Sequence, residues 1–335
     1  MSGETINKSG SQPLPHRVPA LSGILKLLRL FRAPNLTLIA LTDYLIYYGL
    51  INPYFHRNGI RGSWDPHLFP LFVCVTLYIT AAAYLVNDIL DASTDAVNRP
   101  EKLVMKNKTR RRFGWWLYWS MTVAAGLLSL YIAWEREQLS YWLLYPLSVA
   151  LLFGYNTLWK GTPLWGNLLV ALFCGGVPAL FFLTEWEPLI LLEGVNPPDA
   201  KQLASILTAY ALFAFLSNLY REQVKDLQDE MGDRATGKNT AAVTWGQKTA
   251  RSIAQCTCLF LAIGIMSMVV WYIPLDNIFL PHIFLIQLPL GYSGVMLHRA
   301  QNPKDFRKVG LWIKFIMLAG LLLLTYMIYL VHGTS

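Results

Sequence analysis

The chain has 335 residues, of which 54% are hydrophobic and only 14% are charged, and its mean hydropathy is +0.38. A soluble globular domain carries roughly a quarter charged residues, whereas the apolar residues here occur in blocks of about 20, the length that crosses a hydrocarbon core of about 30 Å. The composition excludes an ordinary soluble protein and predicts a polytopic membrane protein. The formal net charge of +8 is then mainly a topology signal and not evidence for nucleic-acid binding.

We predict an all-α fold in three parts. Residues 1–22 are polar and proline-rich and are expected to form a disordered cytosolic tail, residues 23–331 a single transmembrane domain of about nine helices, and residues 332–335 an external tail. The expected spans are 23–50, 68–91, 113–134, 139–158, 163–184, 202–222, 247–273, 277–298 and 310–331.

The orientation follows from the basic residues. With the N-terminus in the cytosol, nearly all of the 28 Lys and Arg residues fall on the cytosolic side, and only Arg57, Arg61, Arg136 and Lys201 fall on the other. This bias predicts a cytosolic N-terminus and an external C-terminus.

An acidic group stands at the end of the second span. If the helix continues into it, Asp88, Asp91 and Asp95 stand at i, i+3 and i+7 and share one face with Asn87. Like charges at a helix C-terminus repel each other and oppose the helix dipole, so this group requires a compensating cation.

The same spacing recurs at Asp226, Asp229 and Asp233, after the sixth span. Both spans run from outside to inside, so both clusters are expected at the cytosolic face. One acidic cluster alone is typical of solvated residues at a helix end, but the repetition favours a functional site.

Oxygen ligands of this kind suit Mg²⁺, which binds one or two carboxylates together with phosphate oxygens. Two facing clusters with basic residues between them predict a diphosphate site, in which Asn87 completes a coordination sphere or contacts a phosphate. The basic candidates are Arg99, Lys102, Lys160, Arg221 and Lys225. Anchoring at the membrane surface is the alternative role for Lys102 and for Arg32, and Lys225 can simply neutralise Asp226.

These residues resemble the signature of the UbiA superfamily of intramembrane prenyltransferases. The matching stretches are Asn87-Asp88-x-x-Asp91-x-x-x-Asp95, Arg221-Glu222-x-x-Lys225-Asp226-x-x-Asp229-x-x-Gly232-Asp233, Arg32-Ala33-Pro34-Asn35, Asn98-Arg99-Pro100-Glu101-Lys102 and Tyr155-Asn156-x-x-x-Lys160. The resemblance covers about residues 23 to 331.

The resemblance implies nine transmembrane helices around a central cavity, and a reaction that transfers a prenyl group from an isoprenyl diphosphate to a lipophilic acceptor. By that resemblance, Mg²⁺ held by both Asp clusters draws off diphosphate, with Asp88, Asp91, Asp226 and Asp229 as catalytic residues. Asn87, Arg99, Tyr155 and Lys160 match positions that line the diphosphate pocket, and Asn35, Lys102, Arg221 and Lys225 are further candidates for substrate binding.

Two questions stay open at this point. The second motif is similar to that of the branch acting on geranylgeranylglyceryl phosphate, but an aromatic or quinone-type acceptor fits as well. A secondary transporter, which also uses intramembrane carboxylates, is the alternative function, and the test is whether the protein consumes a prenyl diphosphate with Mg²⁺.

Overall fold

The computed structural model describes residue 28 and residues 30–98, 104–105, 107–273 and 277–333. All regular elements within these residues are helices, which confirms the all-α fold. The predicted tail 1–22, Arg99, Lys102 and the last two residues of the predicted external tail lie outside the described residues.

In the described part of the chain, seven helical stretches are long and apolar enough to cross a membrane. They are α4 (Leu68–Leu90), α6 (Lys108–Glu135), α8 (Trp165–Thr184), α10 (Pro197–Ala235), α11 (Ala241–Trp271), the run of α12 (Phe279–His282), η5 (Ile283–Gln287) and α13 (Leu288–Arg299), and α14 (Pro303–Gly333).

The first and fourth expected spans are composite helices. The first is α2 (Ala33–Tyr44), the π-helical η1 (Leu45–Ile51) and α3 (Asn52–Arg57); the fourth is the 3₁₀ turn η3 (Leu139–Leu143), α7 (Leu144–Gly154) and the π-helical η4 (Tyr155–Trp159). A π segment inserts an extra residue into a turn and re-aims the side chains that follow, and such segments are frequent at functional sites. Two short helices, α5 (Ala92–Asn98) and α9 (Trp186–Val195), complete the described elements.

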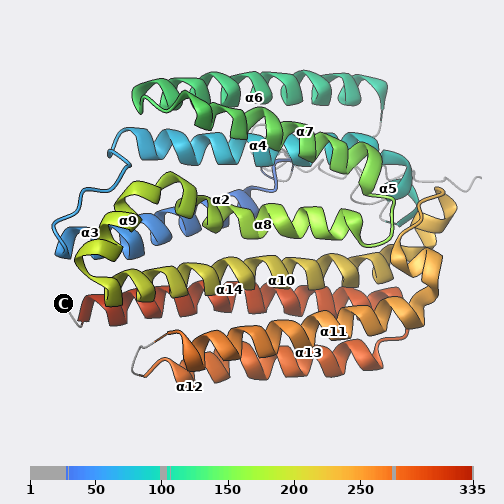
Figure 1. Ribbon diagram of the computed structural model, residues 1–335. Coiled ribbons are helices and arrows are strands. Elements are labelled where there is room, and N and C mark those ends of the chain that lie inside the picture. Colours follow the sequence, from blue (N-terminus) through green and yellow to red (C-terminus); the bar gives the residue numbers. More distant parts are fainter. Residues whose placement is uncertain (1–27, 29, 99–103, 106, 274–276, 334–335) are drawn as a thin grey trace, which may run out of the picture.

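The long helices lie side by side in one bundle, with α10 at its centre (Figure 1). Helix α10 packs against α8, α11 and α14, and also against α5. Its 39 residues correspond to a length of about 58 Å at 1.5 Å per residue, which is well beyond the hydrocarbon thickness. The expected span 202–222 is therefore only the middle of α10, and its last turns project past the apolar region.

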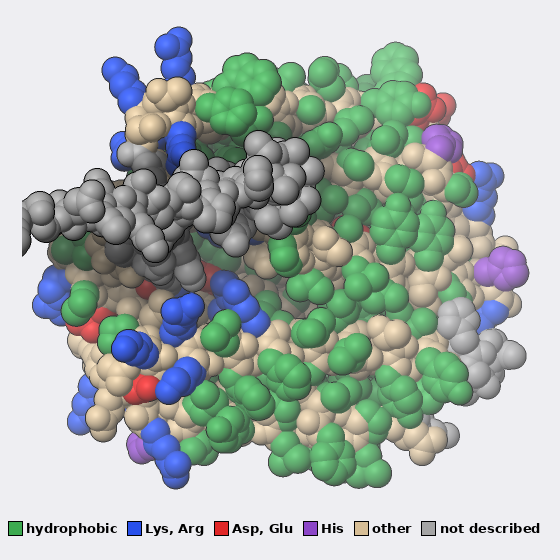
Figure 2. Space-filling model, turned by 180° about the vertical axis from the view of Figure 1, so that it is seen from behind, with side chains coloured by type: hydrophobic (Ala, Val, Ile, Leu, Met, Phe, Trp, Pro, Cys, Tyr) green, Lys and Arg blue, Asp and Glu red, His purple; other side chains and the backbone are tan. Residues whose placement is uncertain are grey.

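The outer surface of the bundle is apolar. Large hydrophobic side chains such as Trp116, Leu127 and Phe260 point outward, as expected for a surface that faces lipid. Figure 2 shows these side chains over the middle of the molecule, with Lys and Arg gathered mainly at one end. That end carries α5 and the last turns of α10.

At the opposite end of the bundle, polar contacts hold the connecting segments together. Arg57 donates two hydrogen bonds to the carboxylate of Asp199, at 2.8 and 2.6 Å. The fully buried Glu185 accepts a hydrogen bond from the backbone N–H of Ser63 at 2.8 Å. These contacts join the connections at that end and leave the other end for the Asp clusters.

Candidate active site

A cavity of about 1960 Å³ lies within the bundle and reaches the Asp clusters at one end. It is larger than the 300–1,000 Å³ typical of ligand pockets. All six predicted metal ligands line it: Asp88, Asp91, Asp95, Asp226, Asp229 and Asp233. The described candidates for substrate binding line it too: Asn35, Asn87, Tyr155, Lys160, Arg221 and Lys225. Beyond this polar end, the wall is largely apolar and includes Leu152, Phe173, Leu180, Phe213 and Leu321.

The first cluster sits where α4 ends. Asp91 caps the helix, its backbone N–H bonds to the carbonyl of Asn87 at 2.9 Å, and α5 restarts at Ala92 with Asp95 in its first turn. Asp88 forms an ion pair with Arg32 at 2.6 Å, and the Arg32 guanidinium lies 4.5 Å from the centre of the Tyr84 ring. The Tyr84 hydroxyl in turn accepts a hydrogen bond from Asn35 at 3.4 Å.

Two lysines neutralise Asp91. Lys160 pairs with Asp91 and also donates to the side chain of Asn87, and Lys238 pairs with Asp91 at 2.9 Å. Burial on its own raises the pKa of Asp91, but the two ammonium groups outweigh it and bring that pKa down to about 2. Burial lowers the pKa of Lys160 to about 8, against the opposing effect of Asp91. Asp91 is therefore a carboxylate at neutral pH.

The second cluster lies on the last turns of α10. Asp226 accepts a hydrogen bond from Asn167, at the start of α8, at 2.8 Å. One turn earlier, Glu222 pairs with Arg221 at 2.5 Å and with Lys225 at 3.3 Å. Cations and carboxylates thus alternate along this part of α10, from Arg221 to Asp226, before Asp229 and Asp233 follow.

Lys238 joins the two clusters. Its ammonium group lies 2.9 Å from the carboxylate of Asp91 and 4.0 Å from that of Asp233. The clusters come from segments far apart in the sequence, and a single cation touches both. The structure thus brings the two clusters together at one end of the bundle.

Asn98 holds α5 against α10. Its side-chain amide donates to the carbonyl of Asp229 at 3.2 Å, and its side-chain oxygen accepts from the backbone N–H of Gly232 at 3.0 Å. A Cβ atom at position 232 would overlap the Asn98 carboxamide, so only glycine permits this approach. Thr94 and Thr236 add a hydroxyl contact at 3.2 Å between the same two segments.

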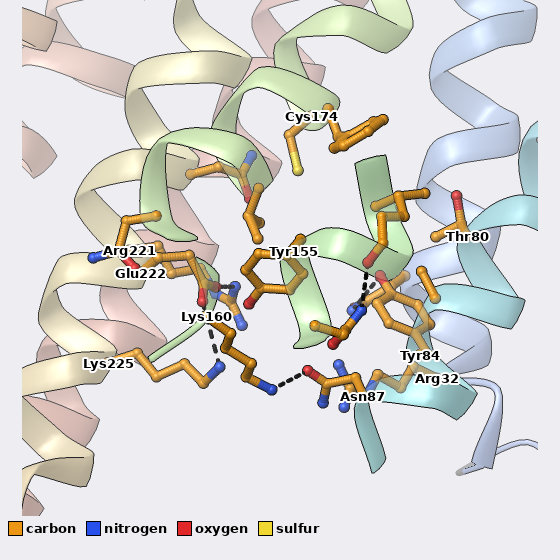
Figure 3. A pocket seen from close by; sticks show the side chains of 18 of the residues that line it. Arg32, Thr80, Tyr84, Asn87, Tyr155, Lys160, Cys174, Arg221, Glu222 and Lys225 are labelled. Atoms are coloured by element: carbon orange, nitrogen blue, oxygen red, sulfur yellow. Dashed lines mark hydrogen bonds and ion pairs between the residues drawn. The ribbon is translucent and has the colours of Figure 1, made fainter. Parts of the chain in front are cut away.

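Tyr155 and Lys160 owe their positions to the π-helical turn η4 (Tyr155–Trp159). Tyr155 is buried and lines the cavity, and the Lys160 ammonium lies 5.9 Å from the centre of its ring. In the view of Figure 3, Tyr155 lies between the Arg221–Glu222 pair and the Tyr84–Arg32 pair. This turn therefore presents both side chains to the polar end of the cavity.

Several residues of this arrangement were not assigned to the site from the sequence, among them Arg32, Lys238, Asn98 and Asn167. Arg32 and Lys238 look like ordinary membrane-surface cations in the sequence, because only the fold shows which carboxylate each contacts. Asn98 opens one of the stretches quoted above, and Asn167 ends Pro163-Leu164-x-Gly166-Asn167, which also resembles the signature of the family. These stretches were the signal available for the two residues.

A membrane-spanning helical bundle whose cavity combines a polar end of carboxylates and cations with an apolar body is suited to an amphiphilic ligand with an anionic head. The chain belongs to the UbiA prenyltransferase family, whose model matches residues 59–318.

The three relatives described here share one name. The chain is 30% identical over 190 residues to the digeranylgeranylglyceryl phosphate synthase of Methanopyrus kandleri, which covers 56% of this chain and 62% of that protein. The synthase of the same name from Methanoregula boonei is 30% identical over 207 residues, covering 60% of this chain and 66% of that protein. In both cases the match spans just under two thirds of the relative's length. The synthase from Natronomonas pharaonis is 24% identical over 261 residues, covering 77% of this chain and 84% of that protein.

A solved structure has the same fold. The work is titled "Structural and mechanistic insights into the biosynthesis of Digeranylgeranylglyceryl phosphate synthase in membranes". It matches 92% of this chain and 99% of the solved chain with a TM-score of 0.59 and 19% sequence identity. At that identity the likeness concerns the fold alone.

Proposed function

We propose that this protein is a prenyltransferase. It transfers a geranylgeranyl group from its diphosphate to the free hydroxyl of a glyceryl phosphate that already carries one such chain, and it releases diphosphate. The family and the name of the similar synthases support this acceptor over the aromatic or quinone-type acceptor that the sequence left open.

The observation that carries the proposal is the junction of the two Asp clusters at Lys238, at the polar end of a cavity with an apolar body. A prenyl diphosphate has the matching polarity, with a charged head on a long hydrocarbon chain. The six Asp carboxylates of the two clusters lie at one end of the bundle, and those of the first cluster follow an uninterrupted α4. Ion sites of secondary transporters, by contrast, lie near the membrane midplane on broken helices.

In the proposed reaction, the C–O bond between the prenyl group and the diphosphate breaks, and the bonding electrons stay on the diphosphate oxygen. The acceptor's hydroxyl oxygen attacks the resulting allylic carbocation to form the new C–O bond, and its proton passes to the released diphosphate. Lys160, Lys225 and Arg32 stabilise the negative charge that develops on the leaving group, because they are fixed at the polar end before the reaction begins. The apolar cavity wall keeps water from the carbocation.

The donor set at this end fits Mg²⁺. It consists of carboxylate and amide oxygens, which magnesium prefers together with phosphate oxygens. In the conformation observed, the carboxylates of Asp88 and Asp91 form ion pairs with Arg32, Lys160 and Lys238. Within the described residues, no three acidic, His or Cys side chains converge on one metal position. We propose that these cations leave their carboxylate partners and pair with the diphosphate when the donor binds. The carboxylates that would then hold Mg²⁺ are those of Asp88, Asp91, Asp95, Asp226, Asp229 and Asp233. The metal would supply Lewis-acid neutralisation of the leaving group.

We further propose that the end bearing the Asp clusters and the N-terminus face the cytosol, and that the C-terminus is external. The concentration of Lys and Arg at that end supports this orientation (Figure 2).

The test is diphosphate release by purified protein from radiolabelled geranylgeranyl diphosphate, with Mg²⁺ and the glyceryl phosphate acceptor. Asp91→Asn and Asp229→Asn should each lower the rate at least about 100-fold. Each removes a carboxylate that would hold the metal, and the metal would neutralise the charge on the departing diphosphate. Glu187→Gln, an exposed carboxylate in α9 at the opposite end of the bundle, is the matched control and should turn over like the wild type. Wild-type rates in both Asp variants would refute the two-cluster site.

A further inference from the structure

One wall of the cavity is a single face of α14. The residues at spacings of three and four along this helix all line the cavity: Lys304, Arg307, Leu311, Lys314, Leu318 and Leu321. Such spacing places side chains in one stripe. The polarity of the stripe changes along the helix: cations predominate in the first turns and leucines in the later ones. It therefore has the polarity of a lipid with an anionic head group.

The cations at the start of the stripe differ from those at the Asp clusters. Lys160 and Lys238 both form ion pairs with Asp91. Lys304 and Arg307, by contrast, line the cavity and have no ion-pair partner within the described part of the chain. Lys308 follows Arg307 directly, but it pairs with Asp305 at 3.6 Å and does not line the cavity. At Lys304 and Arg307, the cavity-facing side of α14 thus carries positive charge that no described carboxylate neutralises.

Lys314 continues the basic stripe inward. It stands seven residues after Arg307, two helical turns or about 10 Å deeper along α14. Its neighbours Ile313 and Ile316 are buried in the core, while Lys314 itself is exposed and lines the cavity. A lysine at such a depth is costly in lipid and is typical of a polar pathway or binding site. The cavity is therefore polar along α14 beyond the level of the first helical turns.

The proposed reaction requires a second anion site. The acceptor carries a phosphate of its own, and this dianion would be repelled by six aspartates and by the donor's diphosphate if it lay among them. It needs cations that the Asp clusters do not already hold, at some distance along the cavity wall.

Resting on the function proposed above, we propose that Lys304 and Arg307, with Lys314 below them, bind the phosphate of the glyceryl phosphate acceptor. Leu311, Leu318 and Leu321 then contact its prenyl chain. The α14 stripe sets acceptor specificity, and the cations around the two Asp clusters bind the donor.

The experiment uses the full chain in nanodiscs of neutral phosphatidylcholine and compares two acceptors, geranylgeranylglyceryl phosphate and the phosphate-free geranylgeranylglycerol. Arg307→Ala and Lys304→Ala should each raise KM for the phosphorylated acceptor about 10- to 100-fold, the weight of one charge-assisted hydrogen bond. The donor KM and kcat should not change. The KM for the phosphate-free acceptor should be the same in the variants and in the wild type, and Arg307→Lys should restore part of the affinity.

Lys308→Ala is the matched control, because it removes a cation from the same turn that faces away from the cavity. A loss in this variant equal to that of Arg307→Ala would overturn the subsite, since general surface charge would then explain both. Equal loss for the two acceptors, or a change in donor KM, would overturn it as well.

Two further outcomes separate this inference from the proposed function and from lipid binding. Wild-type protein that fails to prenylate the glyceryl phosphate refutes the proposed function itself, whereas transfer with unchanged KM in Arg307→Ala and Lys304→Ala refutes only the subsite. Should the variants match the wild type in neutral nanodiscs and differ from it only when phosphatidylglycerol is added, the stripe binds lipid head groups and not the acceptor.

Discussion

Gly232→Ala tests the contact that holds the two Asp clusters together. The new methyl group would overlap the Asn98 carboxamide, which has to rotate away and lose its hydrogen bonds to the Asp229 carbonyl and the Gly232 N–H. Two such bonds are worth about 1–3 kcal/mol together. Replacing glycine by alanine inside a helix offsets about 1 kcal/mol of this loss, because alanine has the higher helix propensity. We therefore expect the free energy of unfolding to fall by at most about 2 kcal/mol.

The effect on activity should be far larger. If α5 moves by about 1 Å, Asp91 and Asp95 no longer face the carboxylates of α10 at the spacing the site uses, and misplacement on this scale costs about 100-fold in rate. We expect kcat for diphosphate release to drop by about that factor while the thermal midpoint in detergent moves by a few degrees.

The double variant with Asn98→Ala gives the sharper readout. Asn98→Ala alone loses both hydrogen bonds but creates no overlap, so its activity should fall less than that of Gly232→Ala. Combining the two substitutions should return activity to the level of Asn98→Ala, because the overlap disappears with the carboxamide. Additive losses in the double variant, or wild-type kcat in Gly232→Ala, would refute the docking of α5 on α10 through these residues.

Two more predictions concern charges at opposite ends of the bundle. Lys238→Met removes the cation shared by Asp91 and Asp233 and should lower kcat/KM for the donor about 100-fold, with partial recovery in Lys238→Arg; an unchanged value would show that the bridge is incidental. Burial raises the pKa of Glu185 to about 7 from its usual 4.5, so the folded state binds the extra proton and stability should fall by up to about 3 kcal/mol as the pH rises from 4.5 through 7. Thermal midpoints measured across that range should decline more steeply in the wild type than in Glu185→Gln, and parallel curves would contradict this role of Glu185.

The sequence was sufficient for the fold class because membrane insertion imposes a simple rule. Apolar stretches of about 20 residues and the distribution of Lys and Arg do not depend on which helices are neighbours. The same rule explains the inaccurate ends of the sixth span: α10 continues as a helix beyond its apolar part, where hydropathy no longer reports on it. The π segment η1 had no signal in composition, because its residues are as apolar as those of the helices beside it. In η4, Asn156 and Thr157 add polar side chains, but no residue pattern there distinguishes a π turn from an α turn.

At the site, spacing within one helix was predictable and partners across helices were not. Asp226, Asp229 and Asp233 lie along one helix, so their common face follows from the helical repeat. That Arg32 pairs with Asp88, or that Lys238 touches both clusters, depends on how distant segments pack. A surface cation and a site cation have the same sequence signature, and only the fold distinguishes them.

The most direct test of the central claim is product analysis with both substrates present. Wild-type protein incubated with Mg²⁺, geranylgeranyl diphosphate and geranylgeranylglyceryl phosphate should yield a glyceryl phosphate with two prenyl chains by mass spectrometry, and one diphosphate for each molecule of product. Diphosphate formed without that product, or no consumption of the donor at all, would contradict the account.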